Sequence, residues 1–393
     1  MIAVIADDFT GAAEIGGIGL RYGLSVVIET GDIQDHNADI LIIATDTRSL
    51  TANEASEQVY SITKELLKLN PLFIFKKIDS VLRGNVAAEL TAQMKASGQN
   101  RAIVVAANPI FNRIIKDGIY YIDGIPLKDT FFSSDPDFPV YSSSVLEIVG
   151  IENGTEIRNL KPNDEIPEHG LIIGDVTCNA DLENWAIYNN KKTLLAGASG
   201  FFEALLLQQR ILSASEPIQS VPFGSKILYI LGSTYPKDSE FLKKLEEIGY
   251  SQFNMPEEIY YNKNFDPFHF ECWVNDIVRG IEEHDKVVVS ILHPPCNDND
   301  ITSRIKDSIG MLAQKVVERV SLSELMIEGG ATTSAVLKYL NINKLFPIQE
   351  LNTGVIRMRI DGITNFCLTT KPGSYQWPDH VWYPESINFA ANN

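Results

Sequence analysis

The sequence predicts an α/β protein with mostly parallel sheets, arranged in two domains. Its 393 residues exceed the roughly 100–200 residues that one domain usually holds. Short apolar runs alternate with amphipathic segments of helical periodicity along most of the chain, which is typical of parallel strands joined by helices. Residues 213–225 are rich in Ser, Pro and Gly, so we predict a linker there between domain 1–212 and domain 226–393.

In the first domain, apolar runs predict buried strands and segments with a 3.6-residue period predict helices. Residues 112–144 differ, because they carry Gly, Pro, Asp and aromatic residues without helical periodicity. We expect a long functional excursion or hairpin there. The predicted strands span 2–6, 26–29, 40–44, 72–76, 102–106 and 171–175, and the predicted helices span 54–69 and 85–94.

The alternation of strands and helices restarts after the linker. Several of its strands run directly into turns that contain glycine, and these turns are candidate binding sites. The predicted strands of this domain span 226–231, 286–291, 325–327 and the residues around 366–368, and the predicted helices span 239–248, 303–320 and 332–340.

Composition and charge exclude several classes of protein. Hydrophobic residues make up 45% and charged residues 21%, which is an ordinary globular composition. The net charge of −18 disfavours binding to nucleic acid or to an anionic membrane. No uncharged apolar run approaches the ~18 residues of a membrane helix, and we expect no secretory signal. Four scattered cysteines without a CxxC pair favour a reduced, cytoplasmic protein.

The first candidate site follows the first predicted strand. Asp7 and Asp8 come directly after that strand, and Thr10 and Gly11 open the next helix. Open α/β sheets place ligands at the carboxyl ends of their strands. A carboxylate there can take a proton from a substrate hydroxyl or hold Mg²⁺. The structural alternative is that Asp8 only caps the helix, and spacing alone leaves both interpretations open.

Two further strand ends carry charged side chains. Arg48 follows the predicted strand 40–44 and is suited to bind a carboxylate through two parallel hydrogen bonds, although a surface arginine is the alternative. The run from Lys77 to Arg83 follows the next strand and includes Asp79 and Ser80. Its cations suit an anionic group, and its acid and hydroxyl suit substrate hydroxyls, so a binding loop is indicated.

Glycine-bearing turns follow three predicted strands of the second domain. Gly329, Gly330, Ala331 and Thr332 join a short strand to a helix, and glycine lets the backbone approach a phosphate at a helix N-terminus. No Walker A lysine follows, so this is not the usual P-loop. A tight turn with a helix cap is the structural alternative. The other two turns contain Gly232-Ser233 and Pro372-Gly373.

Taken together, these motifs resemble the four-carbon acid sugar kinases, and the resemblance extends over nearly the whole chain. In that family the same motifs occur in the same order along the sequence. The matching segments are Asp7-Asp8-Phe9-Thr10-Gly11-Ala12, Thr47-Arg48-Ser49, the run from Lys77 to Asn85, Asn108-Pro109, Asp117-Gly118, Gly124-Ile125-Pro126-Leu127, Asp175-Val176-Thr177, Gly232-Ser233, Gly329-Gly330-Ala331-Thr332 and Lys371-Pro372-Gly373.

The resemblance implies two three-layer α/β domains that face a central cleft. The first would bind the sugar acid and the second ATP. The implied reaction transfers the γ-phosphoryl group of ATP, with Mg²⁺, to a hydroxyl of threonate, erythronate or 3-oxo-tetronate, as part of carbohydrate metabolism. The implied sugar-acid site contains Asp7, Asp8, Arg48, Lys77, Asp79, Ser80 and Arg83, and the implied ATP site contains Ser233, Gly329, Gly330, Ala331, Thr332 and Gly373.

Within this hypothesis, Arg48 and Lys77 hold the substrate carboxylate and Asp8 accepts the proton of the attacking hydroxyl. The sequence leaves open whether the roles of Asp7 and Asp8 are exchanged.

Two alternative functions also remain open. One is a regulatory protein that binds the sugar acid without turnover, because Leu231, Pro372 and Gln376 depart from the common pattern of the nucleotide turns. The other is a kinase for a different small polyol acid. The sequence does not identify the metal ligands. It also does not decide the oligomeric state, and a homo-oligomer is one possibility.

Overall fold

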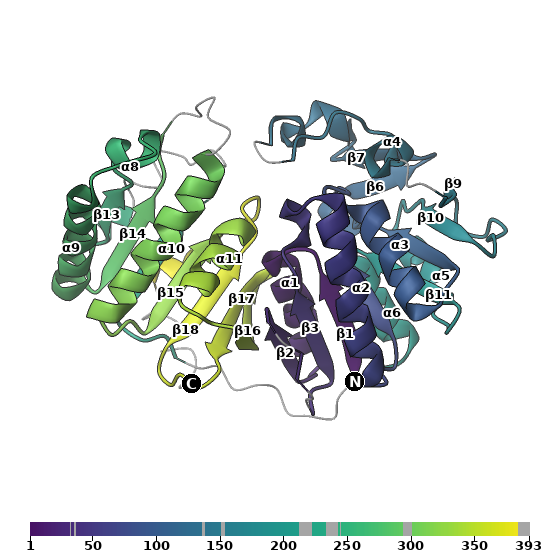
Figure 1. The fold of residues 1–393 in the computed structure, drawn as a ribbon, viewed down its shortest axis with the longest axis horizontal. Coiled ribbons are helices and arrows are strands. Elements are labelled where there is room, and N and C mark those ends of the chain that lie inside the picture. The colour runs from purple at the N-terminus through teal and green to yellow at the C-terminus, as the bar shows by residue number, and fades with distance from the viewer. Residues whose placement is uncertain are drawn as a thin grey trace. The chain divides into compact units, whose positions relative to one another are not determined.

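The computed structural model describes the chain except residues 32, 35–36, 136–137, 151–153, 212–221, 233–242, 244, 294–300 and 384–393. The chain divides into two compact units, Met1–Glu216 and Pro217–Asn393, and each contains helices and its own run of strands (Figure 1). Most of the predicted linker 213–225 and half of the predicted helix 239–248 lie outside the described residues.

The first unit is built on a parallel sheet with the strand order β2-β3-β1-β4-β11-β5-β10-β9. Every residue of β1 and β3 is buried, as expected when helices cover both faces of a parallel sheet. The strands are β1 (Ile2–Ala6), β2 (Val26–Glu29), β3 (Ile40–Ala44), β4 (Ile74–Lys77), β5 (Arg101–Val105), β9 (Ile157–Leu160), β10 (Gly170–Gly174) and β11 (Thr193–Gly197).

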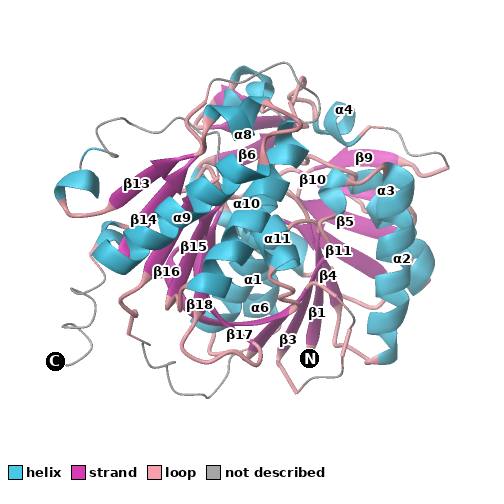
Figure 2. Ribbon diagram, turned by 60° about the vertical axis from the view of Figure 1, so that its left-hand side comes forward, coloured by secondary structure: helices cyan, strands magenta, loops and turns pink. Residues whose placement is uncertain are grey.

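Helices form a layer on each face of this sheet (Figure 2). Helix α1 leads from β1 to β2 and α2 leads from β3 to β4, in opposite directions along the sheet. Right-handed crossovers in opposite directions lie on opposite faces, and accordingly α1 packs against α6 whereas α2 packs against α3. The helices are α1 (Phe9–Arg21), α2 (Ala52–Lys68), α3 (Val86–Ser97), α4 (Val145–Val149), α5 (Asn179–Ala186) and α6 (Ser199–Gln208).

This topology creates a ligand position at the carboxyl ends of β1 and β3. These strands are neighbours in the sheet, and the helices that follow them leave toward opposite faces. Such a switch point opens a crevice beyond the strand ends, which is where open α/β sheets bind ligands. Asp7 and Asp8 follow β1, and Arg48 lies in the short helix η1 (Thr47–Ser49) after β3.

The excursion predicted at 112–144 is confirmed as a small antiparallel sheet. It consists of β6 (Arg113–Lys116), β7 (Ile119–Ile122) and β8 (Ile125–Pro126), followed by the 3-10 helices η3 (Leu127–Asp129) and η4 (Phe131–Ser134). The Asp175 carboxylate accepts hydrogen bonds from the backbone N–H groups of Asp117 (2.6 Å) and Gly118 (3.1 Å). Because Asp175 follows β10, these bonds fix the excursion at the carboxyl edge of the main sheet.

The second unit has the strand order β13-β14-β12-β15-β18-β17-β16. The pairs from β13 to β18 are parallel, and β17 and β16 continue the sheet antiparallel. The strands are β12 (Ile227–Leu231), β13 (Ser251–Asn254), β14 (Lys286–Ser290), β15 (Glu324–Glu328), β16 (Lys344–Asn352), β17 (Val355–Ile360) and β18 (Cys367–Lys371), and the helices are α8 (Glu257–Tyr261), α9 (Pro267–His284), α10 (Ile301–Arg319), α11 (Gly330–Tyr339) and the 3-10 helix η5 (Asp379–Trp382).

An aromatic cluster packs the late part of the chain against this second sheet. The hydroxyl of Tyr229 on β12 donates to the carbonyl of Val381 at 2.9 Å, and the hydroxyl of Tyr250 donates to the carbonyl of Trp382 at 2.8 Å. The Trp382 ring stacks on that of Tyr229 with 4.9 Å between the ring centroids. The buried indoles therefore belong to the core of the second unit.

In the part of the chain that the structure describes, no helix is both long enough and apolar enough to cross a membrane. Cys178, Cys272 and Cys367 are free thiols. Cys296 lies outside the described residues.

A buried ion pair joins β4 to α3 next to the candidate site, since Lys76 immediately precedes Lys77. The ammonium of Lys76 lies 2.6 Å from the carboxylate of Glu89, and both side chains are almost fully buried. Burial raises the pKa of Glu89, and the positive charge of Lys76 opposes that shift. Removal of either partner leaves an uncompensated charge in the core.

We expect Glu89→Ala to lower the free energy of unfolding by about 3–5 kcal/mol, because Lys76 is left buried without its counter-charge. Urea unfolding followed by circular dichroism measures this loss. The control is Glu65→Ala, which removes the partner of Lys68 from an exposed pair on α2 and should cost only about 0–1 kcal/mol. Equal losses in the two variants would contradict the assigned role of burial.

Candidate functional site

The ends of three neighbouring strands are joined by backbone hydrogen bonds at the switch point. The N–H of Asp7 donates to the carbonyl of Lys77 at 3.3 Å, and the N–H of Arg48 donates to the carbonyl of Asp7 at 3.3 Å. These bonds connect the residues that follow β1, β3 and β4. The sequence motifs that lie up to 70 positions apart, from Asp7 to Lys77, therefore meet at one edge of the sheet.

Asp8 is the N-cap of α1. Its Oδ1 accepts a hydrogen bond from the N–H of Gly11 at 2.8 Å, and its Oδ2 accepts one from the hydroxyl of Thr10 at 2.6 Å. The capping alternative is thus confirmed as a structural role of Asp8. The carboxylate stays 13% exposed, so the same group remains accessible to a ligand.

The guanidinium of Arg48 lies among three carboxylates. Its Nε is 2.9 Å from Asp7 Oδ2, its Nη2 is 3.2 Å from Asp8 Oδ1, and its Nη1 is 3.5 Å from Asp79 Oδ1. Burial acts to lower the pKa of Arg48, but the three acids outweigh it and raise that pKa well above its usual range. Arg48 is 12% exposed, so the surface-arginine alternative is wrong.

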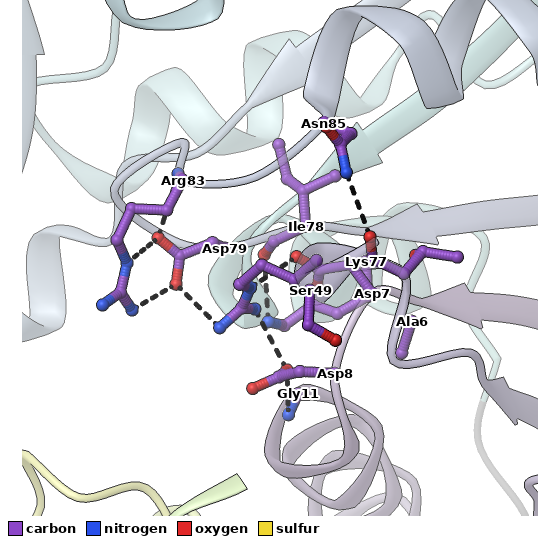
Figure 3. Close-up of polar contacts among 12 residues, drawn as sticks. Ala6, Asp7, Asp8, Gly11, Ser49, Lys77, Ile78, Asp79, Arg83 and Asn85 are labelled. Carbon is purple, nitrogen blue, oxygen red and sulfur yellow. Dashed lines mark hydrogen bonds and ion pairs between the residues drawn. The ribbon is translucent and has the colours of Figure 1, made fainter. Parts of the chain in front are cut away.

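Asp79 and Arg83 form a bidentate ion pair in the loop after β4. Arg83 Nε lies 2.9 Å from Asp79 Oδ2 and Arg83 Nη2 lies 2.8 Å from Asp79 Oδ1, and Figure 3 shows the two side chains facing each other. Arg83 also reaches Asp135 at 2.7 Å. Burial raises the pKa of Asp79, but Arg83 and Arg48 together hold that pKa far below its ordinary value.

Lys77 lies next to Asp8 because Gly11 leaves room for it. A Cβ atom at Gly11 would lie 2.9 Å from Lys77 Nζ and 2.7 Å from Asp8 Oδ1. Lys77 Nζ donates to the carbonyl of Ile78 at 3.0 Å and lies 3.8 Å from the carboxylate of Glu14. Burial raises the pKa of Asp8, but the charges of Arg48 and Lys77 and its two hydrogen bonds outweigh burial, so the pKa is lowered overall.

Ser80 is covered by the excursion. The guanidinium of Arg113, at the start of β6, donates to the Ser80 hydroxyl, and the hydroxyl of Tyr120 on β7 donates to the Ser80 carbonyl at 2.6 Å. Next to Arg83, a cavity of about 280 Å³ opens between the loop after β4 and the segment that follows the small sheet. Its lining comprises Leu82, Arg83, Gly84, Phe138, Pro139, Val140, Tyr141, Ser142, Glu147 and Ile148.

The structure thus brings together every residue predicted for the sugar-acid site, and it adds three that the sequence did not single out for the site. These are Glu14, Asn108 and Arg113. Glu14 accepts a hydrogen bond from Ser199 at 2.8 Å, and Ser199 in turn accepts one from Asn108 at 3.3 Å. Asn108 belongs to a motif of the family resemblance, but nothing local in the sequence marks Glu14 or Arg113 as part of a site.

The glycine turns of the second unit lie side by side at the carboxyl edge of its sheet. Leu231 of β12 pairs with Glu328 of β15, which pairs with Lys371 of β18, so Gly232, Gly329 and Pro372 follow at the same level. The N–H of Gly329 donates to the carbonyl of Lys371 at 2.9 Å. Ser233 lies outside the described residues.

Two of these turns require glycine. Gly329 has φ +102°, which strains any residue with a side chain, and a Cβ at Gly232 would lie 2.2 Å from the hydroxyl of Thr332. Helix α11 starts at Gly330, and in the part of the chain that the structure describes no side chain caps its N-terminus. Its first N–H groups, at Gly330, Ala331 and Thr332, therefore lie at a helix end that favours an anion.

A buried lysine shapes the third turn. Lys371 Nζ donates to the carbonyls of Pro372 at 3.0 Å and Tyr375 at 2.6 Å, and it lies 3.0 Å from the carboxylate of Glu328. The turn that contains Gly373 therefore closes around this ammonium. Among the described residues, no cluster of His, Cys, Asp and Glu side chains has the arrangement of a metal site.

Residues 2–205 match a family model described as a sugar-binding N-terminal domain, which is more than half of the chain. A D-threonate kinase of Salmonella typhimurium is 35% identical over 176 residues, which are 44% of this chain and 39% of the relative. A D-erythronate kinase of Heliobacterium modesticaldum is 25% identical over 86% of this chain and 85% of the relative. The chain belongs to the four-carbon acid sugar kinase family.

Other relatives of the family match over the whole length. A 3-oxo-tetronate kinase of Haemophilus influenzae is 22% identical over 98% of this chain and 100% of the relative. A solved structure of a Haemophilus influenzae protein covers 98% of this chain at a TM-score of 0.70 and 19% identity. At that identity the structural likeness supports the mixed α/β fold alone. The match to the threonate kinase spans less than half of that relative's length.

The low pKa of Asp79 makes its contribution to stability depend on pH. Since its native pKa lies below the ordinary value of 3.8, its ion pairs stabilise the fold fully above about pH 4, and this stability is lost as the pH falls further. We expect Asp79→Asn to lower the free energy of unfolding by about 3–5 kcal/mol at pH 7. The difference from wild type should stay constant from pH 7 to about pH 5 and then shrink as the pH falls through about 4 toward 3.

Urea unfolding at a series of pH values from 7 to 3 measures this difference. The control is Asp276→Asn, which removes one partner of an exposed pair with Arg279 on α9. That variant should differ little from wild type at every pH. A loss in Asp79→Asn that is the same at pH 7 and pH 3 would show that the ionised carboxylate is not the stabilising form.

Proposed function

We propose that this chain is a kinase that transfers the γ-phosphoryl group of ATP to a hydroxyl of a four-carbon sugar acid. Threonate, erythronate and 3-oxo-tetronate are the candidate acceptors, since the relatives carry these names. The observation that carries the proposal is the Asp8 carboxylate, which is kept ionised beside Lys77 and Arg48 at the switch point of the sheet. This carboxylate lies in the part of the chain that matches the sugar-binding model.

Asp8 is the proposed acceptor of the proton from the attacking hydroxyl. Its lowered pKa keeps it deprotonated at neutral pH, and phosphoryl transfer through a loose transition state asks more for positioning than for a strong base. Asp7 and Asp79 are proposed to position the substrate hydroxyls, and Ser80 is proposed to contact the substrate beside them. The nearby charges of Arg48, Lys77 and Arg83 offset those of the acids, so that an anionic substrate can enter the site.

The glycine turns of the second unit are the proposed site of the triphosphate. The free N–H groups at the start of α11 offer donors, and Gly329 and Gly232 leave the backbone open to a phosphate. When bound, ATP supplies the phosphoryl group. Mg²⁺ is proposed to enter with the triphosphate, because Mg²⁺ is commonly held by one or two carboxylates together with phosphate oxygens. The proposed residues are Ser233, Gly329, Gly330, Ala331, Thr332 and Gly373.

The wider setting of the activity is also a proposal. The net charge of −18 supports small molecules rather than nucleic acid as partners. Three free thiols support action in the cytoplasm, where cysteines stay reduced. Two positions depart from the family pattern, Leu231 and the turn that contains Pro372. Leu231 is buried in β12, and the turn is held by the hydrogen bonds of Lys371. Neither departure removes a backbone donor from α11.

We expect Asp8→Asn to reduce kcat by about 10²–10⁴-fold while the KM for ATP stays within about twofold of wild type, because only the proton acceptor is lost. Asparagine retains the capping oxygen, so the fold should persist. The assay is formation of phosphorylated acid from ATP, Mg²⁺ and a panel of tetronates. The control is Asp266→Asn, which makes the same change at the N-cap of α9.

The panel also separates the alternative functions. Turnover of five- or six-carbon acids without turnover of four-carbon acids would indicate a kinase for another polyol acid. Stabilisation of the protein by tetronates without any product would indicate a binding protein. A near-normal kcat in Asp8→Asn would remove Asp8 from the role of base.

We expect Gly329→Ala to raise the KM for ATP by at least about tenfold, because a side chain is strained at φ +102° and the turn must shift. Affinity for the sugar acid, measured by calorimetry without nucleotide, should not change. The control is Gly249→Ala, where φ is +89° but no atom lies within 4 Å of the new Cβ. If both variants keep the wild-type KM for ATP, the proposed triphosphate site is wrong.

A further inference from the structure

The three arginines near the sugar-acid site differ in how their charge is compensated. Arg48 contacts Asp7, Asp8 and Asp79, and Arg83 contacts Asp79 and Asp135. Arg113 makes no ion pair with any residue in the described ranges. Its guanidinium contacts the Ser80 hydroxyl and faces the ring of Phe132 at 5.7 Å from the centroid. Among the described residues, Arg113 is therefore the guanidinium of this group that has no acidic partner.

The position of Arg113 is fixed by its backbone. Its N–H donates to the carbonyl of Asn108 at 3.2 Å, and the N–H of Asn108 donates to the Arg113 carbonyl at 2.9 Å. These bonds tie the start of β6 to the residues that follow β5. The side chain then extends to Ser80, next to Asp79 in the loop after β4. The cation is thus held against the sugar-acid site by a rigid part of the excursion.

The surroundings of Arg113 favour an incoming anion. Arg83 lies over the same ring, with 5.0 Å between its guanidinium carbon and the centroid of Phe132, so two like charges contact one aromatic ring. Arg83 is compensated by its two acids, whereas the contacts of the half-buried Arg113 with described side chains are with a neutral hydroxyl and the ring. A partly desolvated guanidinium gains most from a carboxylate, which matches its fork of donors.

We propose that Arg113, with the Ser80 hydroxyl beside it, binds the carboxylate of the sugar acid and so selects acids over neutral polyols. This inference rests on the proposed function and makes it more specific. The contacts of Arg48 are already with carboxylates, so Arg48 holds Asp7, Asp8 and Asp79 in place rather than the substrate. The hydroxyl chain of the substrate then extends from Arg113 toward Asp8.

The test compares Arg113→Met with wild type in the full-length chain. Binding of D-threonate and D-erythronate is measured by calorimetry without nucleotide, and KM values are measured for acid and ATP. We expect the Kd and KM for the acid to rise by about 10- to 100-fold, because a charge-assisted pair is lost, while the KM for ATP stays within about twofold. Inhibition by erythritol, which has the hydroxyls but no carboxylate, should not change.

The matched control is Arg101→Met. Arg101 is a half-buried arginine at the amino end of β5, on the opposite edge of the sheet, and it also bonds a hydroxyl, that of Thr193 at 2.8 Å. Its loss should leave acid binding at the wild-type level. Arg113→Lys keeps the charge but not the fork, and it should recover part of the affinity that Arg113→Met loses.

Two results would overturn the inference. One is acid binding by a folded Arg113→Met within about twofold of wild type. The other is an equal loss of affinity for the acid and for erythritol, which would indicate a purely structural role. If Arg113→Met fails to fold, as judged by circular dichroism, the same comparison with Arg113→Lys decides. Wild type that binds the acid but forms no product would contradict the kinase proposal, while the binding comparison still decides the role of Arg113.

Discussion

The candidate site of the first unit depends on the ion pairs that the guanidinium of Arg48 makes with three carboxylates. This guanidinium joins the carboxylates of Asp7, Asp8 and Asp79, which follow two different strands, while Arg48 itself follows a third. Three carboxylates this close would repel one another without a shared cation. With Arg48 and Lys77 present, Asp8 stays ionised and fixed in orientation. The parallel sheet brings the three acids together at its carboxyl edge, and Arg48 offsets the repulsion between them.

The carboxyl edge of the second unit's sheet carries different chemical groups from that of the first. Its strand ends present backbone donors and glycines instead of charged side chains, as expected for a site that must come close to phosphate oxygens. Lys371, which lies at this edge, is turned inward to Glu328 and to the carbonyls of its own turn. In this chain the described residues thus place charged side chains at the strand ends of the first unit, and glycines with backbone donors at those of the second.

Much of this arrangement could be predicted from the sequence, because it follows from local patterns. Strands β1, β2 and β3 match their predicted spans, since apolar runs bounded by polar residues mark buried parallel strands. The motif around Asp8 and the run from Lys77 to Arg83 follow the same logic of strand ends. The boundaries of α3 and α11 differ by a few residues from their predictions, because helix ends depend on caps and tertiary contacts.

The remaining features arise from contacts between distant segments, which a single sequence does not display. Arg113 approaches Ser80 because Asn108 and Asp175 hold the excursion in place, and the burial of Lys371 follows from the turn that closes on it. The most direct test of the account is a crystal structure of the full chain with D-threonate or D-erythronate. We predict a substrate hydroxyl within hydrogen-bonding distance of the Asp8 carboxylate. An acid bound away from Asp8, Ser80 and Arg113 would contradict the account.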